Sequence, residues 1–597
     1  MKRGQKMQQQ LPRFGQLTKL ACMAMAAWAI GASVQAAELS TKSDTTLYFN
    51  AHIFTAEYAH PYAEAIAIRG DRIVAVGTQT EVEKVAGKSV KKVDLQGKFL
   101  MPGMIDAHAH PMWGGMTLVM ASFADANGSI PDLVKFIDAQ IDAHKSFVGD
   151  TLVIYNIDLG YWAHAAELDA ILSHGRYATM PIVLNGSDFH TTWANQAVRE
   201  RAGINADYLR KLPADKQNYF GFDPNFVPNG FVVDFGKNKI EQSLPKPSAG
   251  TFYAAGIAGV QYMNSLGITG WLDAAAIGDA SGTPLSSADK GTLPIYRELA
   301  KQGALTAHVA AYPVLSPNEG IAQVATVKKL QHEFKDVDNL TIPGIKIFAD
   351  GVVEFPSQTA TLTKPYINSG RIVPTLFKQA TMNAMVLQAD KNGLQVHVHA
   401  IGDGAVKASL DAFEVARKAN PHGKLKHVIT HAQFVAPEDQ QRFAQDNVIA
   451  ALQLLWALAD ASTIDIVQPY IDPAIYRTMY PARSLLDKGA EIAGASDWPI
   501  STAAPFEAMY QAETRLGASG VLFPEQRMPR AAMLYAYTRN AADVLNQLGS
   551  IGTLAAGKRA DLVLIDRDVL TVSADELKGA QVLSTMFAGK QVFGAGL

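Results

Sequence analysis

The sequence predicts an α/β protein with a (β/α)8 TIM-like barrel and a small β domain formed by both ends of the mature chain. Two observations carry this prediction. From about residue 101 to 545, apolar runs typical of strands alternate with segments of helical periodicity, which favours a parallel sheet, and the number of units suits a barrel. Residues 37–100 and 546–597 hold strand-like runs too short for independent cores, so we expect them to fold together.

The composition excludes several classes of protein. Of the 597 residues, 48% are hydrophobic and 18% are charged, which argues against a disordered or fibrous chain. The net charge is −3, so there is no basic excess to bind nucleic acid through its phosphates. Cys22 is the only cysteine, and a metal site would therefore use histidine and carboxylate ligands. The expected partner is a small-molecule substrate, and a homodimer stays open.

The first 36 residues have the pattern of a secretory signal peptide. Basic residues without acidic ones come first, an apolar run follows at residues 20–34, and small residues surround the expected cleavage site after Ala36. We therefore expect an exported protein, periplasmic or secreted. The alternative is a membrane anchor, but the apolar run is shorter than the ~20 residues that a spanning helix needs. No other stretch reaches that length, so no membrane contact is expected after cleavage.

Both halves of the predicted β domain carry hairpin or strand signals. Residues 37–100 contain two β-rich runs around a turn at residues 69–71 (RGD), and similar runs lie at residues 560–566 and 581–593. Within the barrel, residues at about 204–250 break the alternation with many Pro, Asn and Phe. We interpret this stretch as an insertion and, as a hypothesis, expect it to lie over the active site.

The first candidate site residues are His108 and His110. They lie two residues apart at the end of an apolar run, so on a strand both side chains point to one face, where two imidazoles can bind one cation. Pro111 follows, which puts the pair where a barrel strand meets its carboxyl-terminal loop, the side that carries barrel active sites. The alternative is a pair of core or surface histidines, because H-x-H is a common pattern.

Two further histidines lie at the ends of strand-like runs. His399 is close to the turn at Gly402, and His431 is at the exit of the run VIT, so both are candidate metal ligands. Their neighbours are interpreted differently. We expect His397 to be a core residue or a support for a ligand, and His427, which precedes its strand, to be a surface residue.

Asp497 and Lys346 complete the candidate set. Asp497 ends a short apolar strand and, if it faces several imidazoles, is a buried anion that needs a cation; the alternative is a turn or cap residue. Lys346 lies mid-strand between apolar residues, where a buried amine tends to lose its proton. Either it pairs with Asp350, or the neutral amine reacts with carbon dioxide to form a carbamate that bridges two metal ions.

The order of these residues resembles the amidohydrolase superfamily: H-x-H, Lys, His, His, Asp, each on a separate predicted strand. The local sequence is similar to amidohydrolase family 3, which contains N-substituted formamide deformylases and other metal-dependent hydrolases. The matching segments are MPGMIDAHAH, GIKIFADG, HAIGDGAV, THAQFVAPED, GASDWP and GTLAAGKRADLVLID, and they extend over nearly the whole mature chain. The resemblance implies a metal-binding barrel with a composite β-sandwich domain from both ends.

The resemblance also implies a function, the hydrolysis of an amide, formamide or cyclic amide C–N bond by a metal-activated hydroxide. Asp497 would be the general acid and base, serving first the attacking water and then the leaving amine. His190, in a segment similar to the family's D-G-H pattern, is a candidate contact to substrate or transition state; a structural histidine is the alternative. Two divalent ions, expected to be zinc and bridged by carboxylated Lys346, would have the following ligands: His108, His110, Lys346, His399, His431 and Asp497.

Three alternatives stay open. The same site would also suit a deaminase or an ester or lactone hydrolase. It would also suit a single metal, with Lys346 merely structural. A catalytically silent exported binding or regulatory protein is the third, although the intact ligand set argues against it. The chain departs from the family at Gly404, where Arg is usual, and at residues 454–456, changes that we expect to alter the substrate pocket rather than the metal ligands.

Overall fold

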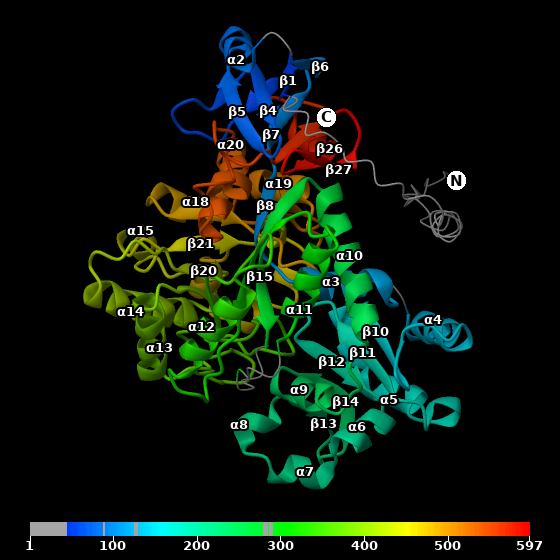
Figure 1. Cartoon of the computed structure of the whole chain (residues 1–597). Coiled ribbons are helices and arrows are strands. Elements are labelled where there is room, and N and C mark those ends of the chain that lie inside the picture. Colours follow the sequence, from blue (N-terminus) through cyan, green and yellow to red (C-terminus); the bar gives the residue numbers. More distant parts are fainter. Residues whose placement is uncertain (1–44, 88–89, 125–128, 279–284, 286–289) are drawn as a thin grey trace, which may run out of the picture. The chain divides into compact units, whose positions relative to one another are not determined.

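The computed structural model describes residues 45–597 except 88–89, 125–128, 279–284 and 286–289 (Figure 1). The predicted signal peptide therefore lies outside the described residues. Among the helices that the structure describes, none is long and apolar enough to cross a lipid bilayer.

Two parallel sheets form the centre of the described chain. Their strands are rich in Val, Ile and Ala and are buried along most of their length, as is typical of parallel strands covered on both faces. The order is β17-β16-β15-β8 in the first sheet and β18-β19-β20-β21-β22 in the second. The strands are β8 (Met104–Ala109), β15 (Ile268–Ile277), β16 (His308–Pro313), β17 (Leu340–Thr341), β18 (Gly344–Phe348), β19 (Gln395–Ala400), β20 (Val428–His431), β21 (Ile449–Leu452) and β22 (Glu491–Gly494).

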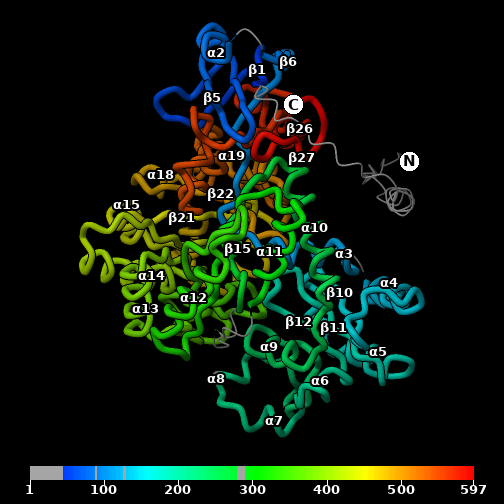
Figure 2. The backbone as a smooth tube through the Cα atoms, in the orientation of Figure 1, coloured from blue at the N-terminus to red at the C-terminus, as the bar shows by residue number. Residues whose placement is uncertain are grey.

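The two sheets adjoin on both sides. A parallel bridge pairs Val314, which follows β16, with Lys346 of β18. On the other side β22 packs beside β8, and the amide of Asp497 donates to the carbonyl of His108 over 2.8 Å. Figure 2 traces the chain through these strands, from β8 in blue through β15 in green to β22 in orange. Because the strands are parallel, residues at their carboxyl ends share one side of the molecule.

Helices follow most of these strands, as the alternation predicts. In α14, Val406, Leu410 and Phe413 are buried at the spacing of one helical face, which packs toward the sheet. The helices are α3 (Pro111–Val119), α10 (Ala249–Ser265), α11 (Leu293–Lys301), α12 (Gln323–Phe334), α13 (Gln379–Lys391), α14 (Asp403–Ala419), α15 (Arg442–Gln445), α16 (Ala461–Ile464), α17 (Pro473–Tyr476), α18 (Ala482–Asp487), α19 (Pro505–Thr514), α20 (Arg530–Tyr535) and α21 (Ala541–Val544).

Strands from both ends of the chain share one six-stranded sheet, of order β27-β26-β25-β7-β2-β3. A second sheet, of order β5-β4-β1-β6, contains the hairpin predicted around the turn at residues 69–71. Leu100 of β7 lies opposite Leu564 of β25. The strands are β1 (Thr45–Phe49), β2 (His52–Phe54), β3 (Tyr62–Ala63), β4 (Ala65–Arg69), β5 (Arg72–Gly77), β6 (Lys91–Asp94), β7 (Phe99–Pro102), β25 (Leu562–Ile565), β26 (Val582–Phe587) and β27 (Lys590–Gly594), with helices α2 (Gln79–Ala86) and α22 (Ala574–Lys578).

A separate sheet interrupts the parallel strands after β8, in the order β13-β14-β12-β11-β10-β9. It begins at residue 147, well before the insertion predicted at about residues 204–250. Apolar runs such as residues 182–186 fit any buried strand, so their pattern does not tell which sheet they join. The elements are β9 (Phe147–Val148), β10 (Thr151–Ile157), β11 (Ile182–Gly186), β12 (Thr191–Ala194), β13 (Phe220–Phe222), β14 (Pro228–Val233), α4 (Ile130–Asp142), α5 (Ala165–Leu172), α6 (Gln196–Ala202), α7 (Ala206–Lys211), α8 (Ala214–Gln217) and α9 (Phe235–Glu241).

The apolar cluster beneath the shared sheet gives a direct test of this pairing. Leu562 is fully buried, in one cluster with Ile53, Ile66 and Leu100 from the other end of the chain. We expect Leu562→Ala to lower the free energy of unfolding by about 2–5 kcal/mol in denaturant titrations. The control, Leu516→Ala, truncates a side chain that is 48% exposed and should change it by less than about 0.5 kcal/mol. Equal effects of the two substitutions would contradict the pairing.

Candidate metal centre

Most of the candidate site residues lie at or near the carboxyl ends of neighbouring parallel strands, and Lys346 is in the middle of its strand. His108 is the fifth residue of β8, and His110 follows that strand directly. In the second sheet Lys346 of β18 lies opposite His397 of β19, and Ala400 of β19 lies opposite His431 of β20. The fold therefore brings residues that are far apart in sequence to one side of the two sheets.

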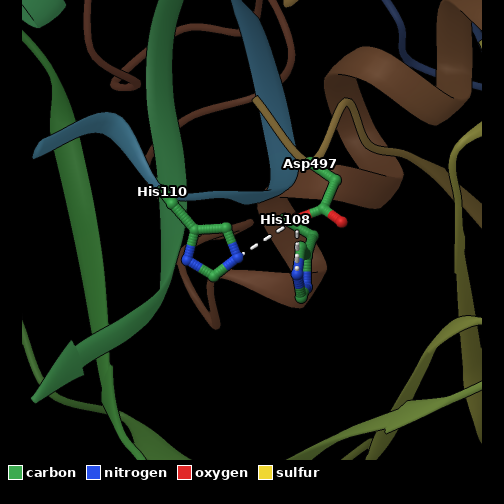
Figure 3. Close-up of side chains that lie close together, drawn as sticks. All are labelled: His108, His110 and Asp497. Carbon is green, nitrogen blue, oxygen red and sulfur yellow. Dashed lines mark ion pairs between the residues drawn. The ribbon is translucent and has the colours of Figure 1, made fainter. Parts of the chain in front are cut away.

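Three of these side chains converge on one point (Figure 3). The Nε2 atoms of His108 and His110 lie 3.2 and 3.1 Å from Oδ1 of Asp497. Asp497 is 7% exposed, and its Oδ1 accepts no hydrogen bond from any described residue. Two imidazole nitrogens and one carboxylate oxygen thus lie close together without a hydrogen bond between them. Ligand atoms around a cation have this arrangement.

His399 and His431 adjoin this cluster. Their ring centroids are 4.5 Å apart, and the ring of His431 lies 5.0 Å from that of His108. Nδ1 of His431 is 4.0 Å from Oδ2 of Asp497. The φ angles of His431 and Asp497 are 69° and 58°, a left-handed conformation that is costly for these residue types and is often found at functional sites.

Lys346 lies in the same region with its amine isolated. The residue is 0% exposed, and Nζ has no hydrogen-bond partner among the described residues. Burial lowers the pKa of the amine to about 7, although the negative charge of Asp497 raises it. Asp350, the alternative partner, instead accepts backbone hydrogen bonds from Thr361, Ile401 and Gly402 at 2.9–3.0 Å. The described residues therefore show no Lys346–Asp350 ion pair.

The imidazoles are held in their neutral form. Burial is the largest cause that lowers the pKa of His108, His399 and His431 well below the ordinary value, and the positive charge of Lys346 lowers all three further. Neutral imidazole is the form that binds metal ions.

Asp106 accepts hydrogen bonds from residues next to the cluster. Its Oδ1 accepts from the amides of His108 and Ser496 at 3.1 Å, and its Oδ2 accepts from the Ser496 hydroxyl at 2.5 Å. Burial raises the pKa of Asp106 to about 7, while the hydrogen bonds with Ser496 lower it. These bonds join the strand of His108 to the loop of Asp497. We missed Asp106 in the sequence, although it lies only two residues before His108.

Other residues orient the imidazoles. Nδ1 of His108 lies 2.6 Å from Nε2 of His397, which fits the support that we expected from His397. Oε1 of Gln453, also missed in the sequence, lies 3.0 Å from Nδ1 of His431. Nε2 of His399 lies 3.0 Å from the carbonyl oxygen of Gly351. Such partners fix the ring orientation of ligating histidines.

The prediction that His427 is a surface residue is wrong. The residue is 3% exposed, and its ring stacks on Phe413 with centroids 4.8 Å apart. Nδ1 accepts from the amide of Val396 over 3.1 Å, and Nε2 lies 3.4 Å from Asp390. A position at the start of a strand does not imply exposure when a helix covers that end, as α14 does here.

A cavity of about 520 Å³ opens over these residues. His108, His110, His399, His431 and Asp497 line one part of it. Some residues of the stretch predicted to be an insertion, among them Asp234, Asn238 and Glu241, line another part. This volume is typical of small-molecule sites.

His190 also lines the cavity. Its Nδ1 lies 2.6 Å from Oδ1 of Asp234, and its ring centroid is 5.9 Å from that of His399. Burial lowers the pKa of His190, but the charge of Asp234 and its hydrogen bond outweigh that effect, so the pKa is raised overall. The structure thus brings His190 to the site with the other predicted residues.

Aromatic side chains form an apolar wall of the cavity. Trp113 and Phe252 pack edge to face with centroids 5.8 Å apart, and Tyr155 and Phe189 stack at 6.0 Å. Two residues of this aromatic wall are close in sequence to site residues: Trp113 is three residues after His110, and Phe189 directly precedes His190. An apolar group of a bound molecule would therefore lie close to the polar cluster.

The parallel α/β fold places a histidine and carboxylate cluster at the strand ends, beside a cavity of the size of small-molecule sites. The chain belongs to the amidohydrolase family, whose model matches residues 91–593, and this confirms the resemblance seen in the sequence.

Individual relatives cover most of the chain. It is 25% identical over 579 residues to N-substituted formamide deformylase from Arthrobacter pascens, covering 92% of this chain and 98% of that protein. It is 28% identical over 425 residues to the exoenzymes regulatory protein AepA of Pectobacterium carotovorum, covering 69% of this chain and 86% of that protein. A solved structure of an uncharacterized metal-dependent hydrolase from Pyrococcus horikoshii superimposes with a TM-score of 0.67 at 22% identity, covering 89% of this chain and 99% of that one.

The isolated amine of Lys346 gives a prediction for the metal-free protein prepared without bicarbonate. The pKa of the amine falls from 10.5 in the unfolded chain to about 7 in the folded chain, so burial destabilises the fold fully below pH 7. This cost declines as the pH rises toward 10.5. We expect Lys346→Met to raise the free energy of unfolding by up to about 4 kcal/mol near pH 7, with the gain vanishing near pH 10.5.

The control is Lys135→Met, which replaces an exposed amine and should change the free energy of unfolding by less than about 0.5 kcal/mol. Denaturant titrations at several pH values measure both variants. A metal-free Lys346→Met variant that is less stable than the parent at pH 7 would contradict a buried, unpartnered amine.

Proposed function

We propose that this chain is a metal-dependent amidohydrolase that hydrolyses the C–N bond of an amide, formamide or cyclic amide. The observation that carries the proposal is the convergence of the His108 and His110 imidazoles on the buried Oδ1 of Asp497, which accepts no hydrogen bond from the described residues. Membership of the amidohydrolase family supports a hydrolase. The similarity to an N-substituted formamide deformylase supports a carbon–nitrogen bond as the target.

We also propose that the two parallel sheets close into a (β/α)8 barrel, in which β17 and β18, both beside β16, count as one strand. Both chain ends would form a composite β-sandwich. The bridge between Val314 and Lys346 and the packing of β22 beside β8 support closure. The shared sheet of β25, β7 and β2 supports the composite domain. Export through the signal peptide stays part of the proposal.

The residues present fit divalent cations. Oδ1 of Asp497 and Nζ of Lys346 are buried polar atoms without hydrogen-bond partners in the described chain, and burial lowers the pKa of His108, His399 and His431. Nitrogen and oxygen donors of this kind suit zinc. Two ions would be held by one set of side chains, with Lys346 bridging as a carbamate: His108, His110, Lys346, His399, His431 and Asp497.

When bound, divalent cations would lower the pKa of a water molecule and polarise a substrate carbonyl. The side chains then have distinct roles. Asp497 accepts a proton from the attacking water at a carboxylate oxygen and gives it to the leaving nitrogen as the C–N bond breaks. His190 contacts the substrate carbonyl from the cavity wall. The imidazoles of His108 and His399, whose pKa values are lowered, would hold the cations and would not take up that proton.

The aromatic wall supports a substrate with an apolar substituent next to the scissile bond. An ester or lactone would use the same residues, as would deamination. A panel of formamides, other amides, cyclic ureas, lactones and aminated heterocycles, assayed with zinc-loaded protein, separates these reactions. Preferential release of amines from N-substituted amides is the expected result.

Asp497→Asn tests the proposed acid and base. The amide side chain keeps the shape but cannot take up the proton, so kcat on the best amide should fall by about 10²- to 10⁴-fold. Metal content, measured by mass spectrometry, should stay the same or fall only partly, because the imidazoles stay in place. The control, Asp338→Asn, alters an exposed carboxylate and should leave kcat unchanged. An Asp497→Asn variant with the parent rate would refute this assignment.

A further inference from the structure

His190 is held in place by a residue of the interrupting sheet. His190 directly precedes β12, and Asp234 directly follows β14, and the register pairs Thr191 with Val233. The amide of Asp234 donates to the carbonyl of His190 over 3.0 Å, and Oδ1 of Asp234 lies 2.6 Å from Nδ1 of the imidazole. Both the backbone and the ring of His190 are thus bonded to Asp234.

The other side of His190 is fixed as well. Oδ1 of Asp188 accepts from the amides of His190 and Thr191 at 3.1 and 2.9 Å. No described group forms a hydrogen bond with Nε2 of His190, and the residue lines the cavity. Since Nδ1 is engaged, Nε2 is the ring atom that remains for a bound molecule.

Asp234 itself adopts a disfavoured backbone conformation. Its φ and ψ are 42° and −105°, outside the regions that L-residues normally adopt. Such conformations are unfavourable and persist where the surrounding structure imposes them. Asp234 immediately precedes α9, from which Lys237 donates to the carbonyl of Phe189 over 2.7 Å. The start of α9 is therefore tied to the turn of His190 at two points.

We propose that Asp234 is a positioning residue, whose carboxylate orients the His190 ring so that Nε2 meets the substrate carbonyl in the cavity. This inference rests on the proposed function, in which His190 contacts substrate. In this proposal the segment around α9 contributes to catalysis by orienting His190. A purely structural contact, which only fastens α9, is the competing explanation.

Two substitutions separate these explanations. Asp234→Asn keeps the size of the side chain but removes its charge. Asp234→Gly removes the carboxylate and accepts a positive φ without cost, so its thermal midpoint should equal or exceed that of the parent. We expect both variants to retain the parent's metal content and to lose about 10- to 100-fold in kcat, with KM within threefold. The control Asp223→Asn changes an exposed carboxylate of the same segment and should leave kcat unchanged.

A double substitution identifies the route of the effect. If Asp234 acts through His190, adding Asp234→Asn to a His190→Gln variant lowers kcat by less than twofold further. A purely structural contact predicts losses that multiply, or a loss that follows the thermal midpoint. Either of these results, or an unchanged kcat in Asp234→Asn, would overturn the proposal.

Binding of a phosphonamidate distinguishes failure of this inference from failure of the proposed function. The methylphosphonamidate of 2-phenylethylamine carries the tetrahedral oxygens of the expected transition state and can be titrated calorimetrically into zinc-loaded protein. We expect Asp234→Asn and His190→Gln to weaken its binding at least tenfold each, without a further loss in the double variant. If the parent hydrolyses no compound of the panel, the proposed function fails, while this binding pattern still decides the role of Asp234. Binding that is equal in parent and variants would reject that role.

Discussion

A buried carboxylate oxygen without a hydrogen bond is the constraint on which the site depends. Oδ1 of Asp497 lies between Nε2 of His108 and Nε2 of His110, yet it accepts no hydrogen bond from the described residues. Burial lowers the pKa of His108 well below its ordinary value, so that imidazole does not supply a compensating positive charge. A buried anion of this kind is costly unless a cation neutralises it. The geometry of these three side chains therefore favours a bound cation between them.

Hydrogen bonds to two other buried carboxyl groups hold the backbone around the cluster in place. Asp106 bonds the backbone of His108 and both the amide and the hydroxyl of Ser496, which joins the first and last of the parallel strands around the cluster. Asp350 performs a similar role on the opposite side by accepting three backbone amides. Both carboxylates are fully buried, and burial raises the pKa of each to about 7. The hydrogen bonds that both side chains accept from neighbouring backbone amides offset part of the cost of burying them.

The sequence predicted the residues of the site better than the layout of the chain between them. His108 and His110 were found because a period of two on a strand puts both on one face, and Lys346 because an amine among apolar residues is rare. His427 was misjudged, because burial at the start of a strand depends on how the preceding helix, here α14, packs against it. The sheet from residue 147 to 233 was not recognised either, since its apolar runs have the same pattern as parallel strands. Asp234 carried no local signal at all, because only the pairing of β12 with β14 brings it to His190, 44 residues earlier in the sequence.

Anomalous X-ray scattering from crystals of the zinc-loaded protein, recorded on both sides of the zinc edge, tests the account most directly. The account predicts one strong peak in contact with His108, His110 and Asp497, a second beside His399 and His431, and density that extends beyond Nζ of Lys346 between them. Crystals grown with excess zinc that give no peak near Asp497 would contradict the proposed metal centre, because the three side chains that converge there would then hold no ion.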